Sequence, residues 1–305
     1  MASAPPRLLL GLLPPYGASA PPTLLRLDVR TMASMTDNSP ERVTVAVTDG
    51  VADVRLNRPD KLNALDPAMV RAIVETTDRL AQDRSLRAVV LSGEGRAFCA
   101  GLDYSGFLAM TGDGSDADVA ELGRTNGRIT HLAQQAAHGW SELAVPVIAA
   151  VHGHCLGGGL QIAVGADLRT VHPEARLAVL EVRWGLTPDM TITARLPELV
   201  GRDVAKELTW TGRTISGEEA MRLGLATRLS DDPRADALAL AREIATKSPH
   251  AIRGAKRLLD QAGTVPLAEQ YAAERDTVVG LIGQPNQVEA VTAYFEKRPP
   301  VFADP

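Results

Sequence analysis

The chain has few cysteines, few aromatic residues and no long apolar run. Its two cysteines, Cys99 and Cys155, provide neither a disulfide framework nor the ligand spacing of a metal site, and they are compatible with a reducing cytoplasm. Aromatic residues make up 4% of the 305 residues, which leaves little for a surface that stacks nucleic-acid bases. A formal net charge of −5 gives no general attraction to nucleic acid or anionic membranes. We therefore expect no metal site, no nucleic acid and no membrane as partners.

The first 40 residues differ in composition from the rest of the chain. Acidic residues are absent before Asp28, and proline pairs such as Pro5-Pro6 exclude a long helix. The apolar run Leu8–Leu13 is too short to cross a bilayer. We interpret residues 1–40 as a disordered or over-long N-terminal extension. Arginines without acids are also typical of a mitochondrial transit peptide, so a mitochondrial location stays open beside a cytoplasmic one, as does a secretory signal.

Strand and helix patterns alternate from about residue 41 onward. Val43–Val47 and Val51–Leu56 flank Asp49-Gly50, which predicts a β-hairpin with a tight turn. Asp66-Pro67 is typical of a helix start, and the short apolar run Ala88–Leu91 predicts a buried strand.

The same order then recurs. Helical residues around Leu122–Leu143 lead to an apolar strand at Pro146–Val151, and a further strand is expected at Asp167–Val171. Strands that alternate with helices indicate an α/β fold. We expect a core over residues 41–230 and a helical region over residues 231–305, with Ser216 and Glu219 forming a helix capping box. The glycine-rich Gly112–Asp118 is expected to be a mobile loop near a site.

Two glycine-containing turns each follow a buried strand. The first lies in Ala97–Asp103, and the second contains the triplet Gly157-Gly158-Gly159 at the start of a helix. Glycine allows backbone N–H groups to approach a ligand closely, and a helix N-terminus adds partial positive charge. Two N–H groups that converge on one oxygen would stabilise an enolate. A single glycine triplet at a helix start is more often a packing feature, so only the two turns together indicate an oxyanion site.

Three segments together resemble the crotonase (enoyl-CoA hydratase/isomerase) superfamily. They are Arg55–Leu65, which reads RLNRPDKLNAL, the Ala97–Asp103 loop, and Ala150–Gln161 with its glycine triplet. The similarity extends over about Val43–Phe302. It implies an α/β fold made of a crotonase-like spiral of ββα units, with a C-terminal helical region that builds homotrimers, often paired into hexamers.

The resemblance also implies positions for substrate contacts. By motif position, Leu102 and Gly158 would supply the two oxyanion N–H groups. Lys61, Leu62 and Ala100 would line the channel for coenzyme A, which is part of an acyl-CoA thioester substrate and not a separate cofactor. The other residues assigned to substrate binding are Gly101, Asp103, Gly157, Gln161 and Lys297, the last in a segment whose family lysine reaches a CoA phosphate in a neighbouring subunit.

The acid and base positions follow the family less closely. Glu181, four residues before Gly185, matches one of the two glutamates of family hydratases. The other glutamate position is occupied by Gln161, which cannot transfer a proton as a carboxyl group does. Asp189 matches a carboxylate position of dienoyl-CoA isomerases in the superfamily, and the third acidic position of those isomerases also falls on Gln161 and is absent. We therefore expect Glu181 and Asp189 to be the proton-transfer groups.

Several alternatives remain open from the sequence. Asp189 could be a helix N-cap, and Glu181 a solvated surface residue. The cysteines and His152 and His154 are expected to serve packing. A non-catalytic acyl-CoA-binding relative or an RNA-binding relative is the rival from another class, and Arg253, Lys256 and Arg257 would form a basic patch for RNA unless they form a solvated helix face. Double-bond isomerisation is favoured over hydration because half of the hydratase pair is missing.

Overall fold

A computed structural model describes residues 41–103, 125 and 127–305. The predicted extension over residues 1–40 and the predicted loop Gly112–Asp118 lie outside these residues. The expected hairpin is present: Asp49 and Gly50 have φ of 50° and 75°, the left-handed pair that a tight two-residue turn requires.

The main sheet has six strands. In spatial order they are β1 (Val43–Thr48), β2 (Val51–Leu56), β3 (Ala88–Gly93), β4 (Val147–Val151), β6 (Leu168–Val171) and β9 (Arg228–Leu229). β1 is antiparallel to β2, and every other neighbouring pair is parallel. Parallel sheets need cover on both faces, which explains why β3 and β4 are apolar throughout.

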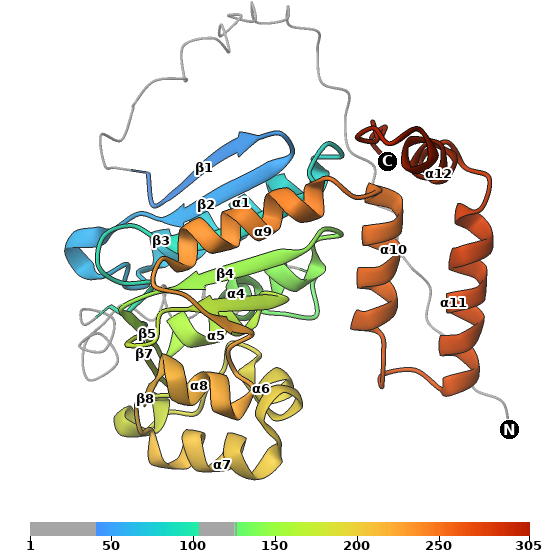
Figure 1. Ribbon diagram of the computed structural model, residues 1–305. Helices are drawn as coiled ribbons and strands as arrows, with labels where there is room; N and C mark the ends of the chain where they lie inside the picture. Colours follow the sequence, from blue (N-terminus) through green and yellow to red (C-terminus); the bar gives the residue numbers. More distant parts are fainter. Residues whose placement is uncertain (1–40, 104–124, 126) are drawn as a thin grey trace, which may run out of the picture. The chain divides into compact units, whose positions relative to one another are not determined.

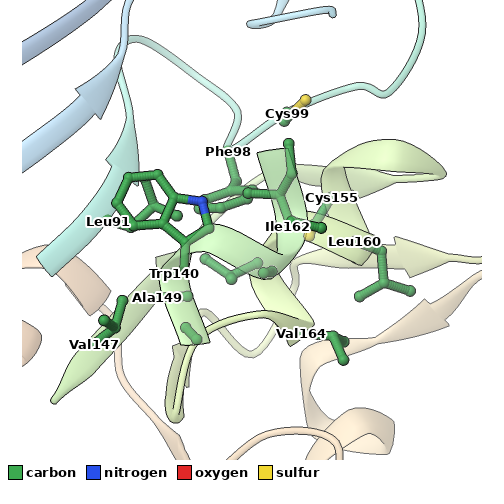
Figure 2. Close-up of a cluster of buried hydrophobic side chains, with 14 of the residues drawn as sticks. Leu91, Phe98, Cys99, Trp140, Val147, Ala149, Cys155, Leu160, Ile162 and Val164 are labelled. Carbon is green, nitrogen blue, oxygen red and sulfur yellow. The ribbon is translucent and has the colours of Figure 1, made fainter. Parts of the chain in front are cut away.

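Helices cover both faces of this sheet (Figure 1). Alternate residues of the same strand pack against the helices of opposite faces. Val89 and Leu91 belong to the core shared with α1 (Pro67–Gln82), α4 (Leu132–Glu142) and α5 (Gly158–Val164). Val90, between them, packs with Ala237 of α9 (Pro233–Ala245) on the other face. Figure 2 shows the first core, where the buried Trp140 of α4 lies among Leu91, Phe98 and Ile162.

A second, smaller sheet positions the site. It contains β5 (His154–Leu156), β7 (Arg176–Ala178) and β8 (Ile215–Ser216), and Cys99 pairs with Cys155 of β5 in a parallel bridge. Each strand has only two or three residues, so hydrophobic alternation could not reveal them. Two 3₁₀ turns flank the site, η2 (Pro59–Lys61) and η3 (Glu181–Trp184).

The remaining helices follow β7 in the chain. They are α6 (Ile192–Val200), α7 (Arg202–Thr211), α8 (Gly217–Leu223), α10 (Pro249–Asp260), α11 (Leu267–Leu281) and α12 (Pro285–Glu296). Ser216 caps α8 by accepting from the Glu219 N–H, but the Glu219 carboxylate pairs with Arg213, so the predicted capping box is only half formed.

The basic residues of α10 differ in exposure: Arg257 is exposed, Arg253 is partly buried and Lys256 is buried. Lys256 is 8% exposed and forms ion pairs with Asp167 and Asp260. Arg253 donates to backbone carbonyl groups at Arg84 and Leu86, and Arg257 donates to the Thr277 hydroxyl. These contacts give the three cations structural roles that hold α10 in place.

Candidate functional site: the paired turns beside α5

The two glycine-containing turns lie side by side, as the sequence predicts. The Cys99 N–H donates to the His154 carbonyl at 2.9 Å, and the Leu156 N–H donates to the Cys99 carbonyl at 3.0 Å. Gly101 has φ +86°, and a Cβ there would lie 2.6 Å from the Leu156 carbonyl oxygen. The close approach of the two segments therefore requires glycine at position 101.

The two expected oxyanion donors occupy equivalent places in these paired segments. Cys99 and Cys155 pair through their backbones, and both are free thiols. Leu102 lies three residues after Cys99, and Gly158 lies three residues after Cys155. Gly158 is the first residue of α5, where a helix leaves its N–H groups without intrahelical partners. Among the described residues, neither the Leu102 N–H nor the Gly158 N–H donates a hydrogen bond within the protein. Both donors are thus available to a ligand oxygen.

Glu181 begins η3 and lies against α5. Its Oε1 accepts a hydrogen bond of 2.6 Å from Nε2 of Gln161, whereas its Oε2 is buried without a protein partner in the described part of the chain. Burial raises the pKa of Glu181, hydrogen bonds from the backbone and from Gln161 oppose that rise, and the nearby charge of Asp189 adds to it. A half-buried carboxyl group with a raised pKa and one buried oxygen without a protein partner has the properties of a general base or acid.

Asp189 is exposed and lies close enough to Glu181 to affect its pKa. The alternative that Asp189 caps a helix is wrong, because the N-cap of α6 is Thr191 and makes no side-chain cap bond. The alternative that Glu181 is a solvated surface residue is also wrong, since its Oε2 is buried. The structure therefore brings Glu181, Gln161 and Asp189 together.

The segment expected to line the CoA channel is fixed by Asn63. This fully buried side chain donates to the carbonyl groups of Glu94 and Ala97 at 2.9 and 2.8 Å and accepts from the Arg58 N–H at 2.8 Å. It thereby joins the turn around Lys61 to the loop that follows β3. The sequence predicted no role for Asn63, because the two carbonyl groups to which it donates lie more than 30 residues away along the chain.

The predicted lining residues occupy different environments. The Lys61 side chain is exposed, and Leu62 has φ 52° with its carbonyl bonded to the Ala100 N–H at 2.9 Å. Asp103 forms a short ion pair with Arg58. Lys297 follows α12 with φ 56° and an exposed side chain. No described residue of the paired turns contacts Lys297 through a hydrogen bond or ion pair within this one chain.

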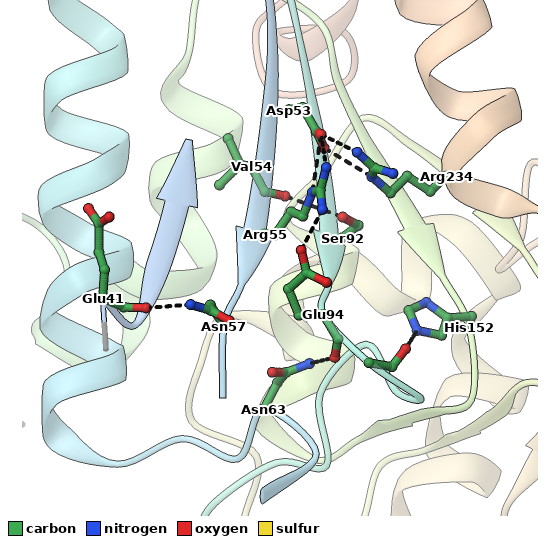
Figure 3. A network of polar contacts seen from close by, with 11 residues as sticks. Glu41, Asp53, Val54, Arg55, Asn57, Asn63, Ser92, Glu94, His152 and Arg234 are labelled. Atoms are coloured by element: carbon green, nitrogen blue, oxygen red, sulfur yellow. Dashed lines mark hydrogen bonds and ion pairs between the residues drawn. The ribbon is translucent and has the colours of Figure 1, made fainter. Parts of the chain in front are cut away.

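The two cysteines serve packing, as expected. Both are buried, and burial raises the pKa of Cys99 to about 12 and the pKa of Cys155 well above its ordinary value. They are therefore neutral thiols and not nucleophiles at physiological pH. His152 is bonded to the Gly95 carbonyl oxygen at 2.9 Å, which gives it a structural role (Figure 3).

A second polar cluster lies away from these residues and was not predicted. Figure 3 shows Asp53 between Arg55 and Arg234, with Arg55 also bonded to Glu94 at 2.5 Å. Burial alone would raise the pKa of Asp53, but the hydrogen bonds and charges of the two arginines outweigh it and lower that pKa. The cluster borders an open hollow of about 530 Å³ that contains none of the predicted site residues.

No group of three metal-binding side chains occurs in the described ranges. Within the same ranges, no helix has the length and apolar character needed to cross a membrane. The candidate site comprises the backbone N–H groups of Leu102 and Gly158, the half-buried carboxyl group of Glu181, the exposed Asp189 and the amide of Gln161.

Comparison with known proteins identifies the family. The enoyl-CoA hydratase/isomerase family model matches residues 46–305. The human mitochondrial Delta(3,5)-Delta(2,4)-dienoyl-CoA isomerase is 37% identical over 256 residues, which cover 81% of this chain and 77% of that protein. The Mycobacterium tuberculosis protein named "Probable enoyl-CoA hydratase echA6" is 35% identical over 260 residues, covering 85% and 98%.

Solved structures agree with this result. The crystal structure of enoyl-CoA hydratase from Bacillus anthracis superimposes with a TM-score of 0.77 at 29% identity, covering 86% of this chain and 98% of that one. The α/β spiral with its trailing helices is the crotonase fold, as the sequence predicted. This chain belongs to the enoyl-CoA hydratase/isomerase (crotonase) family.

Proposed function

We propose that this protein is an enzyme that shifts a double bond in an acyl-CoA thioester. The observation that carries the proposal is the set of carboxyl groups: Glu181 has a free buried oxygen, Asp189 lies nearby, and position 161 holds a neutral amide. Isomerisation requires a proton to leave one carbon and a proton to return to another. One carboxylate, or two in different places, can carry out both transfers.

The proposed reaction begins at C2 of a 3-enoyl or 3,5-dienoyl thioester. The Glu181 carboxylate removes a proton from C2, and the electron pair moves into the thioester carbonyl. The Leu102 and Gly158 N–H groups stabilise the resulting enolate oxygen, which is worth about 3–4 kcal/mol per donor in comparable sites. Glu181, now protonated, returns its proton to the far end of the conjugated system, which regenerates the carboxylate, so no atom is gained or lost. If Asp189 delivers the proton instead, Asp189 must begin protonated and must regain a proton from Glu181 through water before the next turnover.

Hydration is the second candidate. It needs one group to activate water and another to protonate C2, and the second glutamate of the family hydratases is replaced by Gln161. The similarity to proteins named as hydratases favours this alternative, as does the ability of an amide to orient water. A non-catalytic acyl-CoA-binding protein, or an RNA-binding one, is a third alternative.

The test compares wild type with Gln161→Glu on a 2-enoyl-CoA and on a 3,5-dienoyl-CoA. Isomerisation should exceed hydration in wild type, and the new carboxyl group beside Glu181 should raise hydration. Glu181→Gln is the control that should lose both activities. If wild type hydrates a 2-enoyl-CoA at a rate that Gln161→Glu does not improve, isomerisation is the wrong assignment. If no thioester is turned over, the protein is not this enzyme.

We also propose that residues 231–305 form the assembly region of a homotrimer or hexamer. Large apolar side chains on α11 and α12 are exposed in the single chain, and large exposed apolar areas commonly mark interfaces between proteins. The exposed apolar residues of these two helices are Leu267, Tyr271, Val278, Val279, Val288, Val291, Tyr294 and Phe295. In such an assembly Lys297 would add positive charge to the CoA site of a neighbouring subunit.

For location we propose the cytoplasm, with the mitochondrion as the alternative. Two buried thiols suit either reducing compartment. Import of the full chain into isolated mitochondria, followed by N-terminal sequencing of the recovered protein, distinguishes the two.

A further inference from the structure

Gln161 makes two hydrogen bonds that no catalytic step uses. Nε2 donates to Oε1 of Glu181 at 2.6 Å, and Oε1 accepts from the Met190 N–H at 2.9 Å. We propose that Gln161 is a positioning residue that fixes the Glu181 carboxylate and the Asp189–Met190 segment relative to the oxyanion donors. This inference rests on the proposed function of the same site.

The orientation of the Gln161 amide follows from its partners. The Met190 N–H can only donate, so the amide oxygen must face it, and the amide NH₂ must then face Glu181. An ionised carboxylate can only accept, so this arrangement suits the charged form of Glu181. Gln161 is 1% exposed, so water does not compete for either bond. A glutamate at position 161 would need a proton of its own to make the same two contacts.

The first bond determines which oxygen of Glu181 reacts. Because Oε1 is held by the amide, the carboxylate cannot rotate freely, and Oε2 is the oxygen left without a protein partner. The amide also stabilises the negative charge without introducing a charge of its own. Glu181 can therefore remain an ionised base in a buried place, where only Asp189 adds a like charge.

The second bond connects the base to the oxyanion hole. Gln161 lies on α5, the helix that begins at Gly158, and its oxygen holds the backbone of Met190. A Cβ on Gly158 would lie 3.0 Å from the sulfur of Met190, so this side chain packs directly over the donor residue. One buried amide thus ties together the base, the segment that carries Asp189 and the wall of the oxyanion hole.

The experiment measures the titration of Glu181 directly, without substrate. Protein labelled with ¹³C at glutamate carboxyl groups is titrated by NMR, and the Glu181 signal is assigned by its loss in Glu181→Gln. Gln161→Leu removes the donor to the charged carboxylate and should raise the Glu181 pKa by about 1 pH unit or more. The acidic limb of the isomerase rate against pH should move upward by the same amount, because only ionised Glu181 acts as a base.

Gln135→Leu is the matched control. Gln135 is also buried, 2% exposed, and its Nε2 donates at 2.6 Å to a glutamate, Glu142, that is not part of the site. Both leucine variants lose the same kind of bond and should lose a similar amount of thermal stability. Only Gln161→Leu should move the Glu181 titration. An unchanged titration in Gln161→Leu, or an equal shift in both variants, would overturn the proposal.

A second variant covers the case in which Gln161→Leu does not fold. Gln161→Glu keeps an acceptor for the Met190 N–H but places a carboxyl group against Glu181, so the Glu181 signal should again titrate at higher pH. An unchanged signal in this variant would contradict the inference. The NMR titration does not depend on turnover. If the wild-type protein turns over no acyl-CoA but Gln161→Leu still raises the Glu181 pKa, the proposed function is refuted and the positioning role of Gln161 stands.

Discussion

Replacing Gly158 with proline would remove one oxyanion donor with little other change. Gly158 is the first residue of α5, a helical position at which proline is well tolerated, and its N–H donates to no acceptor in the described protein. The new ring carbon would meet Leu65 Cδ1 at 2.8 Å and Met190 Sδ at 3.0 Å. Both atoms are at the ends of side chains that can move, so we expect the variant to fold.

The expected magnitude follows from the single lost donor. Removing one hydrogen bond to a developing oxyanion typically lowers kcat about 10²–10³-fold, or about 2.7–4 kcal/mol in the transition state. KM should change much less, because the ground-state carbonyl carries little charge. The thioester would still be held by the remaining Leu102 donor.

Gly158→Ala is the matched control, because it adds the same Cβ but keeps the N–H. We expect the alanine variant to retain activity within about tenfold of wild type, since the side-chain ends it meets can shift. Steady-state kinetics with an isomerisable thioester, and circular dichroism for folding, make the comparison. A folded proline variant with near-normal kcat, or an alanine variant as impaired as the proline variant, would refute the assignment of Gly158 as a donor.

Three further predictions concern charge and assembly. Because the pKa of Glu181 is raised, the contribution of Glu181 to stability is favourable in acid and is lost as pH rises through the folded-state pKa. Glu181→Gln should therefore stabilise the protein near neutral pH but not near pH 4, measured by chemical denaturation at both pH values. The lowered pKa of Asp53 has the opposite sign, so Asp53→Asn should cost about 1–3 kcal/mol near neutral pH, and that cost should disappear as pH falls through the folded-state pKa. Light scattering should find a trimer or hexamer, and Lys297→Ala should raise KM for acyl-CoA with little change in kcat; a monomer with full activity would exclude this assembly.

Local features of the fold could be predicted from the sequence because neighbouring residues determine them. The Asp49-Gly50 turn, the Asp66 cap of α1 and the start of α5 at the glycine triplet are all confirmed. The short strands β7 and β8 were missed, since two or three residues carry no periodicity. The sequence could not decide whether Asp189 is a helix cap or a proton-transfer group, because an aspartate that follows a proline is compatible with both roles.

The site could be predicted only in part, because its geometry depends on long-range pairing. The resemblance implied roles for Leu102, Gly158 and Glu181. Backbone pairing between Cys99 and Cys155 brings the two glycine-containing turns side by side, and Gln161 of α5 bonds to Glu181. The hydrogen bond from the Met190 N–H to Gln161 joins residues 29 apart, and the Arg234–Asp53 pair joins residues 181 apart. Spacing along the sequence contains no signal for either contact.

Product mass is the most direct test of the proposed reaction. Wild-type protein is incubated separately with a 2-enoyl-CoA, a 3-enoyl-CoA and a 3,5-dienoyl-CoA, and the thioesters are analysed by mass spectrometry together with their ultraviolet absorbance. Isomerisation leaves the mass unchanged while the absorbance reports the shifted double bond, whereas hydration adds one water. We expect isomers of unchanged mass from the 3-enoyl or 3,5-dienoyl substrate, formed faster than any hydrated product. A hydrated product formed faster from the 2-enoyl-CoA would contradict it.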